Sequence, residues 1–68
     1  MTDITKRQEE ALSAVARLTE LYGYPPTVDE LAREMGVTGN AAYEQLLALR
    51  RAGRVAWAAN KARTLRVL

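Results

Sequence analysis

The sequence predicts a mainly α-helical domain that ends in a small β-hairpin. Three segments have apolar residues at helical spacing, and each begins after a threonine and ends before a glycine, which are common signals for the two ends of a helix. After residue 53 the apolar spacing changes to every second residue, as is typical of strands. The 68 residues fit a single domain.

Two helices are expected at about residues 6–22 and 28–35. Thr5 and Thr27 are the expected N-caps, and each is followed three residues later by a glutamine or glutamate that can complete a capping box. The run Tyr24-Pro25-Pro26 between the helices requires an extended connector. The expected buried face of the first helix consists of Leu12, Val15, Leu18 or Thr19, and Tyr22. That of the second consists of Val28, Leu31, Ala32 and Met35.

A third helix is expected at about residues 39–52, with Thr38 as its N-cap and Gly53 as its stop. The turn that separates it from the second helix is very short and has Gly36 at its start. Two short helices joined in this way are typical of a helix-turn-helix motif.

The hairpin strands are expected at about residues 54–58 and 63–68, with residues 59–62 turning between them. Alternation places four side chains on the inward face: Val55, Trp57, Leu65 and Val67. A hairpin that follows a helix-turn-helix motif predicts a three-helix winged helix-turn-helix fold.

The composition excludes most kinds of chemistry. The chain has no cysteine and no histidine, and its one serine is Ser13, so nucleophilic, acid–base and zinc sites lack their usual residues. We therefore expect no enzyme activity, no cofactor and no metal, and no small-molecule site is evident. No apolar run is long enough for a membrane span, and Met1–Ile4 does not resemble the start of a signal peptide, so a soluble cytoplasmic protein is expected.

The charge is unevenly distributed along the chain. Residues 1–35 carry four basic and seven acidic side chains, a net charge of −3, whereas residues 36–68 carry six basic and one acidic side chain, a net charge of +5. A basic half is typical of a surface that binds phosphate groups. A solvated basic surface without a ligand is the alternative interpretation.

The third helix carries the functional prediction. At about 100° per residue, one stripe of this helix is the core face and consists of Ala42, Leu46, Leu49 and Gly53. The opposite stripe consists of Asn40, Tyr43, Glu44, Leu47 and Arg51. An amide, a carboxylate and apolar groups of this kind suit contacts with base edges in the major groove. Packing of Tyr43 and Leu47 on another protein chain or on the hairpin is the alternative.

Other residues are expected to contact the DNA backbone or to have a structural role. The expected backbone contacts are Thr27, Arg51, Arg54, Lys61 and Arg63. Arg66 is interpreted as a solvated residue of the sheet, and Trp57 and Tyr22 as core residues. Tyr24 is expected to pack within the connector.

Several runs resemble the N-terminal DNA-binding domain of LexA-type repressors: Gly23-Tyr24-Pro25-Pro26-Thr27, Glu30-Leu31-Ala32, Asn40-Ala41-Ala42 and the final Leu65-Arg66-Val67-Leu68. The resemblance extends over nearly the whole chain. It implies a winged helix whose third helix reads the major groove of a palindromic operator while the wing contacts the backbone. It also implies that the base-reading part of that helix contains Thr38, Asn40, Ala41, Tyr43 and Glu44; the stripe described above adds Leu47.

The chain also departs from that family. Thr38-Gly39 stands where a Ser-Pro pair often opens the helix, after a link that is one residue shorter, and Tyr43 and Leu47 replace commonly smaller, charged or polar residues. The family's operator sequence is therefore not carried over. The 68 residues contain no counterpart of the family's self-cleaving peptidase half, and Ser13 has no activating lysine, so the family's proteolytic switch is not expected of them.

The leading hypothesis is sequence-specific binding of double-stranded DNA for transcriptional control, with the chain acting as a repressor or as its isolated DNA-binding domain. Pairing of two half-sites would then require a homodimer or a partner protein. Two alternatives stay open. The first is a protein-interaction module whose contact surface is Tyr43, Leu47 and Trp57, and the second is a phage or plasmid accessory factor that docks on another regulator.

Overall fold

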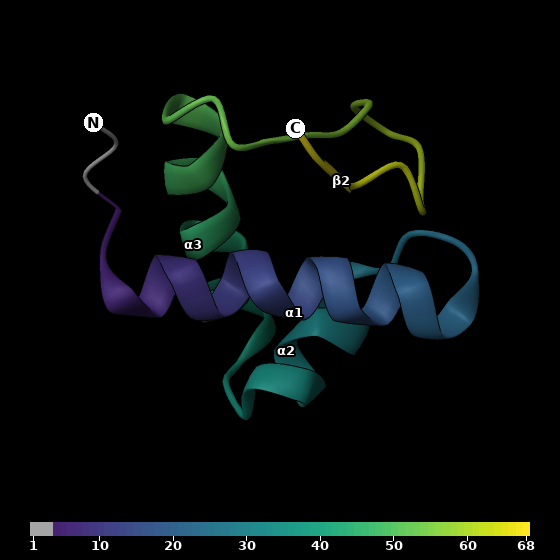
Figure 1. Cartoon of the computed structure of the whole chain (residues 1–68), viewed down its shortest axis with the longest axis horizontal. Helices are drawn as coiled ribbons and strands as arrows, with labels where there is room; N and C mark the ends of the chain where they lie inside the picture. The colour runs from purple at the N-terminus through teal and green to yellow at the C-terminus, as the bar shows by residue number, and fades with distance from the viewer. Residues whose placement is uncertain (1–3) are drawn as a thin grey trace.

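The protein has three helices followed by a two-stranded antiparallel hairpin, as seen in a computed structural model that describes residues 4–68 (Figure 1). The elements are α1 (Lys6–Tyr22), α2 (Val28–Met35), α3 (Gly39–Arg51), β1 (Val55–Ala56) and β2 (Arg66–Val67). The predicted fold class is confirmed. Residues 1–3, on which the expectation about a signal peptide partly depends, lie outside the described residues. None of the helices within residues 4–68 is long and apolar enough to cross a membrane.

Each helix begins at the threonine that the sequence predicts. The hydroxyl groups of Thr5 and Thr27 accept from the backbone N–H three residues later, and the side chains of Gln8 and Glu30 accept in return from the backbone N–H of the threonine. The Thr38 hydroxyl accepts from a backbone N–H in the first turn of α3, without a reciprocal bond. These caps satisfy N–H groups that have no partner within the helix, so they fix where each helix starts.

The turn between α2 and α3 depends on Gly36, whose φ of +70° lies in the left-handed region. A side chain there would be strained, whereas glycine adopts this conformation readily. The backbone N–H of Val37 then donates to the carbonyl of Ala32 at 3.0 Å and closes the end of α2. Because this turn is so short, α3 leaves α2 in a fixed direction.

The core lies where the three helices and the hairpin meet. In Figure 1 α1 runs across the front, with α2 below it, α3 rising steeply behind it and the hairpin above the C-terminal half of α1. All five elements or their flanks contribute buried side chains: Ala11, Ala14, Val15, Leu18, Leu31, Ala32, Ala42, Leu46, Leu49, Val55 and Leu65. The predicted core stripe of α3 is confirmed except for Gly53, which is exposed.

The strands are shorter than predicted, with two residues each in place of about five and six. Val55 pairs with Val67, and Ala56 with Arg66. Beyond these two pairs the Thr64 side chain replaces the bonds between strands. Its hydroxyl accepts from the Ala58 N–H at 2.8 Å and donates to the Lys61 carbonyl at 3.1 Å. The hairpin therefore widens into a loop after two residue pairs.

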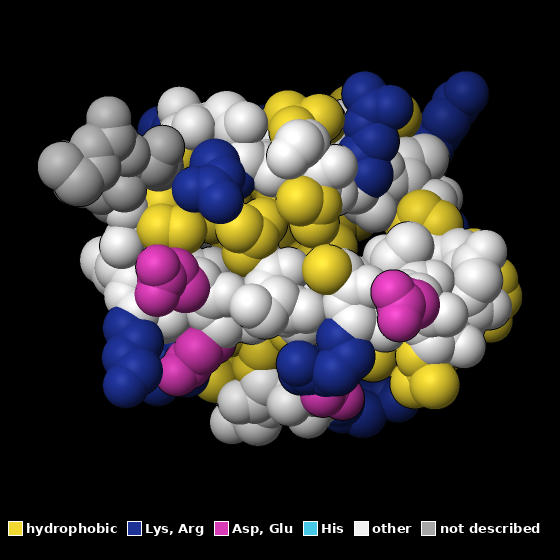
Figure 2. Space-filling model, viewed as in Figure 1, with side chains coloured by type: hydrophobic (Ala, Val, Ile, Leu, Met, Phe, Trp, Pro, Cys, Tyr) yellow, Lys and Arg dark blue, Asp and Glu magenta, His cyan; other side chains and the backbone are white. Residues whose placement is uncertain are grey.

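The inward face of the hairpin is also narrower than predicted. Val55 and Leu65 are buried and Trp57 is partly buried against the core, but Val67 is 42% exposed. Figure 2, in the view of Figure 1, shows hydrophobic side chains gathered just above α1, between this helix and the part of the chain that holds α3 and the C-terminus. Neither residue of β2 is buried, and Leu65, directly before β2, covers the edge of the core.

Truncation of the core should be costly in so small a domain. We expect Leu31→Ala to lower the free energy of unfolding by about 2–5 kcal/mol, because Leu31 is fully buried between the helices and a cavity would remain. Urea denaturation followed by far-ultraviolet circular dichroism measures this loss. Leu21→Ala is the matched control, since Leu21 is 73% exposed and its loss should cost only about 0.5 kcal/mol or less. Equal losses in the two variants would contradict this assignment of the core.

Candidate nucleic-acid interface

The exposed face of α3 holds most of the residues predicted to read bases. Asn40, Tyr43 and Glu44 are exposed, and Leu47 is partly buried on the same side. Ala42, Leu46 and Leu49 on the opposite side are buried. The helix therefore presents an amide, a phenol and a carboxylate within its first two turns, while its other face is anchored in the core.

The N-terminal ends of α2 and α3 contribute two hydroxyl groups. Thr27 is partly buried and Thr38 is exposed, and each hydroxyl accepts from a backbone N–H at 3.1 Å. A threonine hydroxyl that accepts one bond retains its own O–H donor. Both side chains can therefore cap a helix and still donate to a phosphate or a base. Ala41, in the first turn of α3, is partly exposed.

An aromatic contact joins α3 to the hairpin. The rings of Tyr43 and Trp57 lie 6.2 Å apart at an interplanar angle of 56°, a tilted arrangement that aromatic pairs favour. The guanidinium carbon of Arg50 lies over the Trp57 ring at 4.4 Å, within range of a cation–π interaction. The sequence left open whether Tyr43 contacts DNA or packs on the hairpin. In the structure Tyr43 packs on the hairpin, and 43% of it remains exposed.

The basic residues predicted to contact the DNA backbone differ in their surroundings. Arg51 and Lys61 are exposed and Arg54 is partly exposed, and within residues 4–68 none of the three forms an ion pair. Glu44 also has no ion-pair partner in the described part of the chain. The three basic side chains and the Glu44 carboxylate thus all carry charges without an ion-pair partner in the described part of the chain.

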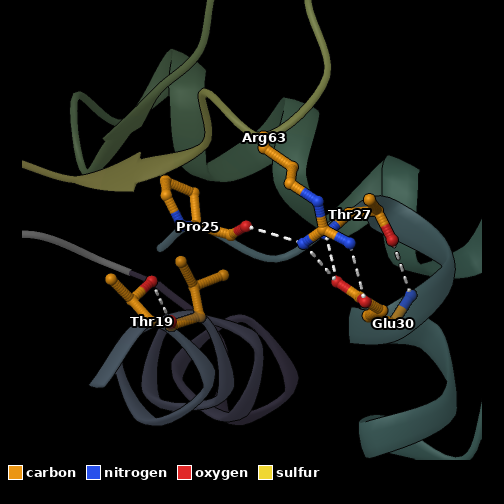
Figure 3. A network of polar contacts seen from close by, with 6 residues as sticks. Thr19, Pro25, Thr27, Glu30 and Arg63 are labelled. Atoms are coloured by element: carbon orange, nitrogen blue, oxygen red, sulfur yellow. Dashed lines mark hydrogen bonds and ion pairs between the residues drawn. The ribbon is translucent and has the colours of Figure 1, made fainter. Parts of the chain in front are cut away.

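Arg63 has a different environment from the other basic residues. Its Nη1 and Nη2 atoms donate to Oε1 and Oε2 of Glu30, both at 3.0 Å, and Nη1 also donates to the Pro25 carbonyl at 3.2 Å (Figure 3). The guanidinium carbon lies 4.8 Å from the centre of the Tyr24 ring, which in turn stacks on Tyr22. These contacts attach the hairpin loop to the connector and to α2. The sequence predicted a DNA-backbone contact for Arg63 and did not predict this pairing.

The loop that Arg63 fastens has an unusual backbone. Asn60 and Arg63 have φ values of +61° and +58°, in the left-handed region. This conformation costs a residue with a side chain about 1–2 kcal/mol, although asparagine tolerates it better than most residues. The bidentate ion pair with Glu30 holds the Arg63 side chain in place on this left-handed backbone.

The same ion pair perturbs the titration of Glu30. The hydrogen bond from Arg63, together with the backbone N–H of Thr27, lowers the pKa of Glu30 from 4.5 to about 2. A carboxylate that is stabilised by hydrogen bonds to its charged form resists protonation in the folded state. The Glu30 carboxylate therefore both caps α2 and holds the hairpin loop through Arg63.

This lowered pKa should make stability depend on acidity. Because the pKa of Glu30 is lower in the folded than in the unfolded chain, its contribution is fully present above pH 4.5 and is lost as the pH falls toward 2. We expect Glu30→Gln to flatten the loss of stability over this range, as measured by urea denaturation at several pH values. Arg63→Met should flatten it too, and the double variant should add little to either change. Additive effects of the two substitutions would contradict the pairing.

Sequence reasoning found the exposed face of α3 but missed the contacts that join it to the hairpin. Arg63 and Glu30 are 33 residues apart, and no local pattern links them. The double proline before Thr27 placed Tyr24 in a stiff connector, but it gave no sign that Arg63 would lie over the Tyr24 ring. Trp57 was expected in the core, and its contact with Tyr43 depends on how the hairpin folds back.

Comparison with known proteins finds similarity to a family of DNA-binding domains along almost the whole chain. The family model of the LexA DNA binding domain matches residues 1–64. The LexA repressor of Leptospira interrogans serogroup Icterohaemorrhagiae serovar copenhageni (strain Fiocruz L1-130) is 31% identical over 68 residues, which cover 100% of this chain and 34% of that protein. The LexA repressor of Burkholderia cenocepacia (strain HI2424) is 42% identical over 69 residues, which cover 100% of this chain and 32% of that protein. The chain spans about a third of the length of these curated relatives, and it belongs to the LexA DNA-binding domain family.

Proposed function

We propose that this chain binds duplex DNA sequence-specifically and thereby represses transcription, most simply by occluding a promoter. The observation that carries the proposal is the exposed face of α3, where Asn40, Tyr43 and Glu44 stand in the first two turns of a helix anchored in the core. A helix of this kind fits the major groove of B-form DNA. Membership of a DNA-binding family supports the same role, and it supports a function in binding without catalysis.

Within this proposal, the N-terminal half of α3 reads the bases. Asn40 can donate to and accept from an adenine edge, and Glu44 can accept from the amino group of a cytosine. Tyr43 and Leu47 supply apolar surface for a thymine methyl group, and Thr38 and Ala41 lie close enough to the helix start to take part. Because Glu44 is a carboxylate among phosphates, it contributes to the choice of sequence more than to affinity.

A second group of residues holds the domain on the DNA backbone. We assign this role to Arg51, Arg54 and Lys61, which are free of ion pairs within residues 4–68, and to the hydroxyl of Thr27. Arg63 instead supports the wing through Glu30, and any phosphate that it contacts must share its guanidinium with that carboxylate. These contacts position the domain without selecting a sequence.

Tight binding requires two copies of the reading helix. A single module of this size buries roughly 600–1,000 Å² of protein surface on DNA, which limits its affinity. We infer that two domains bind a palindromic operator with half-sites about one helical turn apart, either as a homodimer or together with a partner protein. The LexA repressors that match this chain are about three times as long, so the pairing residues can lie beyond the matched third.

Residues that read bases and residues that contact the DNA backbone should respond differently to substitution. We expect Asn40→Ala to flatten the preference among duplexes selected from a random pool, with a loss of about 1–3 kcal/mol at the contacted base pair. Lys61→Ala should weaken binding to all duplexes alike and reduce the slope of log affinity against log salt by about 1. Fluorescence anisotropy with matched and scrambled duplexes measures both effects.

Lys6→Ala is the matched control. It removes an exposed basic residue at the start of α1, outside the proposed interface, and should leave affinity and salt slope unchanged. If Asn40→Ala and Lys61→Ala change affinity and sequence preference in the same way, the division into base-reading and backbone-contacting residues is wrong. Absence of any salt-dependent duplex binding by the unmodified chain would exclude the proposed function.

The contact between Tyr43 and Trp57 predicts a role for Trp57 in selectivity. Trp57→Phe keeps an aromatic neighbour for Tyr43, whereas Trp57→Leu removes the ring and its cation–π contact with Arg50. We expect the leucine variant to discriminate less well at the base pair that Tyr43 contacts, while binding to scrambled duplexes stays the same. Thermal unfolding of both variants shows whether they remain folded at the assay temperature. Unchanged discrimination in folded Trp57→Leu would show that Trp57 does not position Tyr43.

A further inference from the structure

A pocket of about 250 Å³ opens between the start of α2, α3 and the hairpin loop. Apolar side chains from these three regions form its walls: Pro26, Val28, Leu46 and Leu65, with the rings of Tyr43 and Trp57. Pro26, Leu46 and Leu65 are buried in the folded domain, and Val28 is partly buried. The pocket thus has a fixed apolar floor and an aromatic side, which suit a flat apolar ring.

The charged residues that line this pocket are basic. They are Lys61 and Arg63, and no acidic residue of the described chain lines it. Arg63 is paired with Glu30, whereas Lys61 is exposed and forms no ion pair within residues 4–68. A ligand that brings an anionic group to the Lys61 ammonium would therefore meet an unpaired positive charge beside apolar walls.

The loop that forms one wall is held in place by contacts within the protein. Arg63 reaches from the loop to Glu30 and Pro25 (Figure 3), and the Thr64 hydroxyl lies 2.8 Å from the Ala58 N–H and donates to the Lys61 carbonyl at 3.1 Å. Binding to a pocket that is already formed avoids the entropy cost of ordering a loop. These contacts fix the shape of the wall.

We propose that this pocket binds a small aromatic carboxylate, with the ring against the apolar walls and the carboxylate at Lys61. A cavity of about 150 Å³ is enough for benzene, and drug-sized ligands need at least about 300 Å³, so the pocket suits a molecule of one or two rings. Tyr43 and Lys61 also belong to the proposed DNA interface, so ligand and duplex should compete. The competition depends on the proposed function, whereas binding of the ligand does not.

Titration of the free domain with 2-naphthoate tests the site directly. Trp57 is the only tryptophan, so its indole N–H gives a single assignable signal in a ¹H–¹⁵N spectrum of the labelled protein. We expect saturable shifts at Trp57, Tyr43 and Thr64, which line the pocket. Absent shifts, or shifts scattered over α1, would overturn the proposal.

Two alanines of the loop provide a matched pair of variants. Ala62 lines the pocket and Ala59 does not, and both are exposed, so neither substitution disturbs the core. Ala62→Phe should fill the pocket and abolish the saturable shifts, whereas Ala59→Phe should retain them. Thermal unfolding confirms that both variants are folded. Equal binding by the two variants would place the ligand elsewhere and overturn the proposal.

The role of the carboxylate is tested separately. Lys61→Ala should weaken 2-naphthoate binding about two- to five-fold, the range of an exposed ion pair, while Lys6→Ala should have no effect. The neutral analogue 2-naphthamide should bind the unmodified domain more weakly by a similar factor. If naphthamide binds as well as naphthoate and Lys61→Ala changes nothing, the pocket does not select an anion and the proposed ligand class is wrong.

Competition is measured last, with a duplex that the domain binds and with ionic strength matched by sodium chloride. We expect saturating 2-naphthoate to weaken the duplex affinity of the unmodified domain but not that of Ala62→Phe. Unchanged affinity in the presence of bound naphthoate would overturn the regulatory part of the proposal. If the domain binds no duplex at all, the proposed function fails, and the spectra of the free protein still decide whether the pocket binds its ligand.

Discussion

One small cluster of buried apolar side chains holds every element of this domain together. A chain of 68 residues buries a smaller fraction of its surface than a larger protein does, so its core has little stability to spare. Alanines at positions 11, 14, 32 and 42 let the helices approach closely, and leucines at positions 31, 46 and 49 fill the space between them. Because α3 contributes three of these buried residues, the orientation of its exposed face depends directly on the core.

The hairpin loop depends much more on polar contacts. Val55 and Leu65 are its buried anchors, and beyond them the loop is held by the pairing of Arg63 with Glu30 and by the hydroxyl of Thr64. Glu30 also completes the cap of α2, so the start of that helix and the position of the wing are coupled through one carboxylate. The surface between α3 and the loop is therefore shaped by a few bonds near solvent.

Sequence reasoning succeeded where the deciding interaction is local. The caps at Thr5, Thr27 and Thr38 depend on contacts three residues apart, and the buried stripe of α3 follows from helical periodicity, so both were predictable. The strand lengths were not, because the side chain of Thr64 replaces ladder hydrogen bonds in a way that alternation does not reveal.

The contacts that shape the candidate site were also beyond sequence reasoning, because they join residues that are distant in the chain. Tyr43 lies on α3 and Trp57 follows β1, so their contact exists only after the hairpin has folded back. Spacing along α3 identified the exposed residues, but it could not show that one of them is supported by the wing. Arg63 looked like any other basic residue of the loop until its partner on α2 was known.

The packing of the last strand against the first helix has a consequence for synthesis in the cell. Leu65 is part of the core and β2 contacts α1, so the last strand of the domain packs on its first helix. The caps allow the three helices to form in order as they leave the ribosome, because their contacts are local. The core closes only when Leu65 has also emerged, so the nascent domain exposes part of its apolar surface to chaperones and proteases until almost the last residue of this segment is made.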